Sequence, residues 1–155
     1  MRVDVADHTD FPGFLALAGE VEHWFGPMVE VPGFHTAVKS AITAGDAFVV
    51  RGPSPDRPHG AMLAEGTGDT FHIGWLVVSQ TARGGGIGRL LVSALLDRVT
   101  TRPATVDVVT FGADHPAARD GGARVFYERL GFTPGEAAPT GPEGGSRQHY
   151  RLRLV

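Results

Sequence analysis

The chain contains no cysteine and only one lysine, Lys39. The absence of cysteine excludes disulfides, thiolate nucleophiles and cysteine-based metal sites, and we expect no metal ion. The other 13 of the 14 Lys and Arg residues are arginines. Because this bias affects the whole composition, an individual arginine needs a local argument before a function is assigned to it.

A strong net charge and long apolar runs are absent as well. The formal net charge is -3 at pH 7, so the composition gives no reason to expect nucleic-acid binding. No run approaches the length of a membrane span, and the N-terminus lacks the apolar core of a signal peptide, so we expect a cytoplasmic protein without membrane association. With 155 residues, 42% hydrophobic and 20% charged, the sequence predicts one globular domain over residues 1–155.

The first half of the chain predicts two helices followed by an antiparallel meander. A short strand near the N-terminus leads to Thr9 or Asp10, either of which can cap a helix. The next two segments show helical apolar spacing, and the second ends near Gly45. Three short apolar runs then alternate with turn residues. The expected helices cover residues 11–23 and 34–44, and the expected strands cover residues 47–51, 60–66 and 70–78.

The second half predicts two parallel strands joined by a helix. Apolar residues at helical spacing give the segment 86–100 one apolar face, and a strand over 104–112 follows. Because a helix joins it to the strand over 70–78, these two strands should be parallel. The fold class is therefore α/β (α+β), a mixed, mostly antiparallel sheet with helices on both faces. The remaining expected elements are a helix over 123–130 with Gly131 as its left-handed cap, a Pro/Gly loop over 134–146 and a strand over 147–154.

Between the two parallel strands lies "SQTARGGGIGRLL", in which a strand ends at three consecutive glycines and a helix begins. A helix N-terminus presents unpaired N–H groups and partial positive charge, and glycines let an anion approach the backbone. Arg83 and Arg89 bracket this turn, so we expect a phosphate site here. A tight connection between strand and helix is the alternative explanation of the glycines, and a solvated side chain is the alternative for Arg89.

The segment does not match the other common phosphate-binding loops. A Walker loop requires a Gly-Lys-Ser/Thr end, and the chain has no lysine here. The dinucleotide pattern finds no glycine at its last position. The pattern that fits is Arg-x-x-Gly-x-Gly, at Arg83, Gly86 and Gly88. In this respect "LVVSQTARGGGIGRLLVSALL" resembles the acyl-CoA-binding motif of the GCN5-related N-acetyltransferase (GNAT) family.

A second block, "DGGARVFYERLGF", resembles the later motif of the same family, Asn-x-x-Ala-x-x-(aromatic or Leu)-Tyr-x-x-x-Gly-Phe. The chain departs from this motif at Asp120, where the family commonly has Asn. We interpret Asp120 first as the N-cap of the following helix and second as a cofactor contact. The two blocks occur in the family's order with one expected strand between them. The residues that match the second motif are Ala123, Phe126, Tyr127, Gly131 and Phe132.

The resemblance implies that the two parallel strands splay apart and that acetyl-CoA is the acyl donor. Its pantetheine arm would pair with the backbone at the end of the first parallel strand, and its pyrophosphate would rest on N–H groups of residues 84–88. The peptide-like amides of pantetheine can extend a sheet as a strand does. The residues implied for cofactor binding are Leu76, Val77, Val78, Arg83, Gly84, Gly85, Gly86, Ile87, Gly88, Arg89, Asp120 and Tyr127.

The implied reaction is attack of a neutral amine on the acetyl thioester. By resemblance, Tyr127 is the candidate general acid for the thiolate, and a backbone N–H near Val77 is the candidate oxyanion donor. Packing with one hydrogen bond is the alternative role of Tyr127. His72, Glu65 and His115 are candidate bases, either directly or through water. Strict alternation along the strand would place His72 on the side of Gly74, Leu76 and Val78.

The acceptor-binding residues of such a fold are expected near the first two helices and the last hairpin. Glu22, Trp24, Phe25 and Phe34 are the candidates, because an apolar slot with an acidic rim would suit an amine with an apolar body. A helix–helix corner packed with aromatic residues is the alternative. The expected function is N-acetylation of a small-molecule or peptide amine. A silent acyl-CoA-binding regulatory module is the alternative, and a homodimer is possible.

Overall fold

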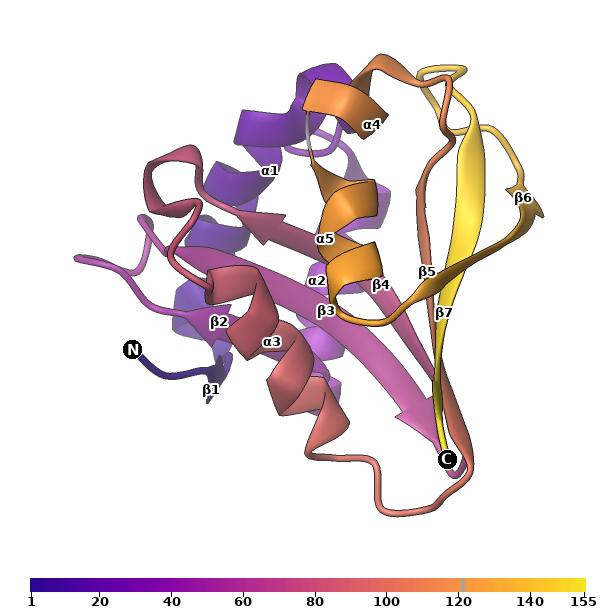
Figure 1. The fold of residues 1–155 in the computed structure, drawn as a ribbon. Coiled ribbons are helices and arrows are strands. Elements are labelled where there is room, and N and C mark those ends of the chain that lie inside the picture. The colour runs from indigo at the N-terminus through magenta and orange to yellow at the C-terminus, as the bar shows by residue number, and fades with distance from the viewer. Residues whose placement is uncertain (121) are drawn as a thin grey trace.

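The computed structural model describes residues 1–120 and 122–155, and for Arg119 and Asp120 it describes the backbone alone. These residues form a seven-stranded mixed sheet in the order β1-β2-β3-β4-β5-β7-β6 (Figure 1). Within this described part of the chain, only β4 and β5 pair in parallel, and the other neighbours are antiparallel. The predicted α+β class is confirmed. The strands are β1 (Asp4–Val5), β2 (Ala47–Val50), β3 (Gly60–Thr67), β4 (Thr70–Val78), β5 (Ala104–Phe111), β6 (Thr133–Ala138) and β7 (Arg147–Leu154).

Helices cover both faces of the sheet, which creates two apolar cores. Phe14, Leu17 and Val38 fill the core beneath α1 and α2 on one face. Leu91 and Tyr150 belong to the core beneath α3 and α5 on the other face. All five of these side chains are at most 1% exposed. The helices are α1 (Phe11–Phe25), α2 (Pro32–Ala44), α3 (Ile87–Leu96), α4 (Pro116–Asp120) and α5 (Ala123–Arg129), with short 3-10 turns at His8–Asp10 and Gln80–Ala82.

The parallel strands β4 and β5 diverge after a short paired stretch. Their pairing begins at Thr70 and Thr105 and ends at Ile73 and Val108. The C-terminal half of β4 therefore has no strand beside it on the β5 side, and Figure 1 shows the two strands separating with α5 near the gap. Unpaired strand groups at such an edge can bind an extended ligand. The splay that the resemblance implied is present.

A bulge in β4 changes which face its side chains point to. Leu63 pairs with Trp75 and Ala64 with Ile73, so Gly74 is an extra residue without a direct partner in β3. Ile73 and Leu76 both pack in the core beneath α3 and α5, whereas Trp75 packs beneath α1 and α2. The predicted alternation was wrong here, because the bulge inverts it. His72 lies on the α1 and α2 face, opposite Leu76.

Several element boundaries also differ from the prediction. Helix α3 ends at Leu96, four residues early, and α1 continues two residues further, to Phe25. The segment expected as a loop contains most of β6, and α4 was not predicted. Pro134 is tolerated in β6 because this strand lies at the sheet edge and carries an irregularity between Pro134 and Ala137.

The entry to α5 differs from the prediction in its capping residue. Gly122, with φ of +70°, stands at the N-cap, whereas Asp120 is the last residue of α4. The expected cofactor contact of the Asp120 side chain lies outside the described residues. At the other end, α5 ends at Arg129, and Gly131, with φ of +97°, follows the C-cap residue Leu130, as expected for a left-handed cap.

Candidate active site

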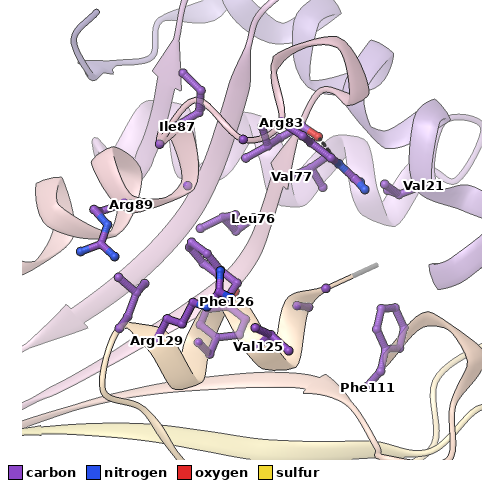
Figure 2. A pocket seen from close by; sticks show the side chains of 18 of the residues that line it. Val21, Leu76, Val77, Arg83, Ile87, Arg89, Phe111, Val125, Phe126 and Arg129 are labelled. Atoms are coloured by element: carbon purple, nitrogen blue, oxygen red, sulfur yellow. Dashed lines mark hydrogen bonds between the residues drawn. The ribbon is translucent and has the colours of Figure 1, made fainter. Parts of the chain in front are cut away.

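A cavity of about 700 Å³ lies where β4 and β5 separate. It extends from the turn before α3 past the end of β4 and α5 to the C-terminal part of α1 (Figure 2). Most of the residues expected to bind the cofactor line it, so the splay, the glycine turn and the second motif meet in one place. The lining residues are Val21, Trp24, Phe25, Leu76, Val77, Val78, Arg83, Gly84, Gly86, Ile87, Gly88, Arg89, Phe111, Gly122, Ala123, Val125, Phe126, Tyr127, Arg129 and Leu130.

Gly84 and Gly86 form the turn between β4 and α3 in a conformation that favours glycine. Their φ angles are +83° and +82°, which other residues adopt only with strain. A Cβ atom added at either position would meet nothing within 4 Å, so open space lies beside the backbone there. The first helical bond of α3 runs from Leu90 N–H to the Gly86 carbonyl, 3.0 Å. The preceding N–H groups have no intrahelical acceptor, which suits an anion.

Gly88 serves a different purpose from the other glycines of the motif. A Cβ at this position would lie 2.8 Å from two ring atoms of Phe126. Gly88 therefore allows α5 to pack closely against α3. The alternative explanation of the glycines was a tight connection between strand and helix, whereas Gly88 serves the contact between α3 and α5.

Three arginines supply the charge of the cavity. Arg83 and Arg89 belong to the predicted set, whereas Arg129, near the end of α5, was missed. Figure 2 shows Arg89 and Arg129 at the same end of the cavity. Sequence spacing offers no signal for Arg129, because its approach to the turn depends on the packing of α5 against α3. Arg83 Nε donates to the Val78 carbonyl at 3.5 Å and extends toward the Val21 end.

Tyr127 lies in the wall of the cavity and is 5% exposed. Its ring makes edge contacts with Phe126 and Phe132, at centroid distances of 5.0 and 5.3 Å. Burial raises the pKa of the Tyr127 phenol. The hydroxyl therefore keeps its proton at neutral pH and can act as a hydrogen-bond donor or acid.

None of the three candidate bases lines the cavity. His115 is 9% exposed, and Ala117 N–H donates to its Nδ1 at 3.0 Å. Its Nε2 lies 3.4 Å from Glu143 Oε1, so both ring nitrogens are engaged. Glu65 is exposed and pairs directly with His72 across β3 and β4. His115 thus has no nitrogen lone pair for an amine proton, whereas Glu65 is accessible.

His72 is oriented by a carboxylate that sequence reasoning missed. His72 Nδ1 lies 2.9 Å from Asp107 Oδ2, and His149 Nδ1 lies 2.9 Å from Asp107 Oδ1. A carboxylate only accepts hydrogen bonds, so each Nδ1 carries the proton and Nε2 of each neutral ring has the lone pair. The contact joins β4, β5 and β7, and spacing along the chain does not reveal it.

The four acceptor candidates lie in different places. Trp24 and Phe25 line the cavity, whereas Phe34 packs on Trp75 in the core, with ring centroids 5.7 Å apart. Glu22 does not form an acidic rim. Its Oε2 accepts from Met28 N–H at 2.6 Å and from Val29 N–H at 3.1 Å.

These hydrogen bonds from the backbone lower the pKa of Glu22. The Glu22 carboxylate, in its charged form, therefore holds the turn after α1 in place. Of the expected acceptor residues, only the aromatic pair on α1 reaches the cavity.

The splayed sheet, the glycine turn at a helix N-terminus and the buried tyrosine define the class of GNAT acetyltransferases. A family model described as "Acetyltransferase (GNAT) domain" matches residues 44–134, more than half of the chain. The chain therefore belongs to this family and is an N-acetyltransferase of the acyltransferase class.

Solved structures with the same fold include members of this family. An acetyltransferase of the GNAT family from Bacillus cereus is 15% identical, with 99% of this chain and 97% of that chain covered and a TM-score of 0.71. A chain of the NatC complex bound to Gag peptide and CoA is 16% identical over 100% of both chains, with a TM-score of 0.72. An aminoglycoside 6'-N-acetyltransferase complexed with coenzyme A is 18% identical, with coverage of 100% and 98% and a TM-score of 0.70.

No protein with a curated description matches the sequence significantly. Within residues 1–120 and 122–155, no helix has both the length and the apolar character of a membrane span.

Proposed function

We propose that this enzyme transfers the acetyl group of acetyl-CoA to a primary amine of a small molecule or peptide, by direct attack in a ternary complex. The supporting observation is that one cavity joins the glycine turn, the unpaired edge of β4 and Tyr127. An extended donor with a diphosphate at one end fits this arrangement. The donor supplies the thioester carbonyl, and the chain supplies the groups that hold and polarise it.

Each part of the cavity has a role in this proposal. Backbone groups of Leu76, Val77 and Val78 pair with the pantetheine amides, since they have no β5 partner. N–H groups of residues 84–88 hold the diphosphate, with Arg83, Arg89 and Arg129 as counter-charges. The expected contact of Asp120 remains part of the proposal.

Two polar groups of the chain act on the reacting atoms. A backbone N–H near Val77 donates to the carbonyl oxygen as negative charge develops on it. Tyr127, a neutral phenol in a buried position, donates its proton to the departing sulfur. Both groups belong to rigid elements, so they need no rearrangement when charge moves.

The amine must lose a proton, and we assign this task to His72. Its Nδ1 is bound by Asp107, which leaves Nε2 to accept a proton on the α1 and α2 face. His72 lies four positions before Leu76 in β4, roughly 13 Å along the strand, so the transfer runs through a chain of water molecules rather than by direct contact. Glu65, on the neighbouring strand, can receive the proton next.

The proposal is tested by thiol release from acetyl-CoA with a panel of primary amines. We expect amine-dependent thiol release together with thermal stabilisation by CoA alone. Stabilisation by CoA without thiol release from any amine would instead support the silent binding module. The absence of both effects would exclude the cavity as an acyl-CoA site.

A further inference from the structure

The cavity has two chemically different ends. Arg89 and Arg129 lie at one end, near the glycine turn, and Val21 and Phe111 lie at the other, with Leu76 between them (Figure 2). Arg83 extends toward the Val21 end, so among the described residues this end carries a cation but no carboxylate in its lining. Under the proposed function the diphosphate occupies the end with Arg89 and Arg129. The opposite end then lies beyond the acetyl group, where the body of the acceptor must sit.

The walls of this second end are aromatic and are held by contacts within the protein. The rings of Phe25 and Phe111 lie 4.7 Å apart, and the guanidinium of Arg147 packs over both, 5.3 and 4.8 Å from their centroids. His115 stacks on Phe111 at 4.4 Å. Trp24, also in the lining, is braced by the ring of His23 at 4.5 Å. The end is therefore a preformed apolar slot.

The carboxylates near this slot are already bound to other groups. Glu20 accepts from Gln80 N–H at 2.9 Å and from the Ser79 hydroxyl at 3.1 Å. Glu22 holds two backbone N–H groups of the turn after α1. Glu143 receives two bonds from Arg147, 2.7 and 2.8 Å. These hydrogen bonds hold the three carboxylates against the chain, and none of the three residues belongs to the cavity lining.

The charges of the cavity lining also disfavour a second ammonium group on the acceptor. Among the described residues, the charged side chains of the lining are Arg83, Arg89 and Arg129, without a carboxylate. An acceptor with a second ammonium group would place that charge in the apolar slot without a partner, which is unfavourable. An acceptor with one amine loses its charge before attack and leaves only an apolar body to bury.

We propose that the acceptor is a monoamine with an apolar, preferably aromatic, body, and that polyamines and other polycations are poor acceptors. This inference rests on the proposed acetyl transfer and adds the substrate class. It also contrasts with the similar structure described as an aminoglycoside acetyltransferase, since an aminoglycoside carries several amines. The slot formed by Val21, Trp24, Phe25 and Phe111 selects the acceptor.

The first experiment compares phenethylamine, ethylamine and spermidine as acceptors for acetyl-CoA by thiol release. We expect kcat/KM for phenethylamine to exceed that for each of the others by roughly 10-fold or more, because an apolar pocket discriminates by the apolar surface it buries. A parallel calorimetric titration measures phenethylamine and spermidine binding to the CoA complex, which does not depend on turnover.

The variants Trp24→Ala and Trp24→Glu test the slot itself. Trp24→Ala should lower kcat/KM for phenethylamine about 10-fold with little effect on ethylamine. Trp24→Glu should bring kcat/KM for spermidine closer to that for phenethylamine, because the glutamate supplies a carboxylate for the second ammonium group. Phe34→Leu is the matched control, since Phe34 packs nearby but outside the lining, and it should leave the ratios unchanged.

Three results would overturn the inference. One is faster acetylation of spermidine than of phenethylamine, with the proposed reaction itself intact. Another is a Trp24→Ala variant that changes the preference between acetyl-CoA and hexanoyl-CoA but leaves kcat/KM for each amine unchanged. That result would assign the slot to the acyl chain. The third is tighter calorimetric binding of spermidine. Tight binding of phenethylamine without thiol release would support the inferred ligand class and contradict the proposed reaction.

Discussion

At the scale of single residues, burial and hydrogen bonding determine what a side chain can do. Tyr127 and His115 are both buried, but only Tyr127 lines the cavity, and its raised pKa keeps the proton on the phenol. Both nitrogens of His115 are engaged by Ala117 and Glu143. Of these two buried ionisable residues, Tyr127 is thus a candidate acid and His115 a structural group.

Tyr127→Phe should keep CoA binding and reduce turnover. The ring remains to pack against Phe126 and Phe132, whereas the proton donor to sulfur is lost. We expect kcat to fall about 100-fold, the lower range for a general acid, with the dissociation constant of CoA changed by less than about 2-fold. Steady-state thiol release and calorimetry measure the two quantities. Unchanged kcat would remove Tyr127 from the mechanism.

Asp107→Asn should change the protonated nitrogen of His72. The Asn amide can donate to Nδ1, which favours the Nε2–H tautomer and removes the lone pair that accepts the amine proton. Nitrogen-15 NMR of the imidazole reports the tautomer, and we expect kcat to fall at least about 10-fold. His149→Asn, on the other carboxylate oxygen, is the control with little effect. A His72 tautomer that stays unchanged in Asp107→Asn would contradict the positioning role of Asp107.

At the scale of elements, the turn between β4 and α3 combines two demands. Gly84 and Gly86 supply positive φ beside open space, and Gly88 supplies close contact with Phe126 of α5. The turn thereby presents helix N–H groups, while α3 and α5 stay packed together. Within this one motif, Gly84 and Gly86 serve the proposed binding of phosphate, and Gly88 serves the packing of the helices.

Gly86→Val should weaken CoA binding in addition to its cost in stability. Gly68, in the turn between β3 and β4, is a matched control, because it also has positive φ, +66°, and no atom within 4 Å of an added Cβ. Valine at either site should cost roughly 1–2 kcal/mol of stability through backbone strain. Only Gly86→Val should weaken CoA binding, by at least about 10-fold, measured by calorimetry. Equal affinities in the two variants would exclude the turn as the phosphate site.

At the scale of the whole molecule, carboxylates paired in the fold make its stability depend on pH. Hydrogen bonds from Arg151 lower the pKa of Glu136 to about 2, from an ordinary 4.5. Backbone N–H groups lower that of Glu22. In the unfolded chain these groups take up protons at higher pH than in the fold, so the stability they contribute is complete above about pH 5.

This stability should be lost as the pH falls from about 4.5 toward 2. Urea unfolding at pH 7, 4 and 3 measures the free energy of unfolding. We expect this free energy to decrease from pH 7 to pH 4 and again from pH 4 to pH 3. Glu136→Gln should reduce the slope in this window, and added salt should diminish the effect because Glu136 is exposed. A free energy that rises toward pH 3 would contradict the assigned sign.

The sequence alone determined the parts of this protein that depend on neighbouring residues. The helical spacing of α3, the run of glycines before it and the segment around Tyr127 are local patterns. They predicted the helix and the turn, and through their resemblance to the GNAT motifs they implied the splayed sheet and most of the cavity lining. Local patterns suffice here because backbone preference and the presentation of N–H groups are set within one turn of chain.

Tertiary structure decided the features that depend on register and packing between distant segments. The bulge at Gly74 moved His72 to the other face, and the pairing of β4 with β5 brought it to Asp107. Close packing of α5 on α3 lets Arg129 join the cavity, and the fold of the turn after α1 withdrew Glu22 from it. Such contacts join residues tens of positions apart, and strand register is set cooperatively by the whole sheet.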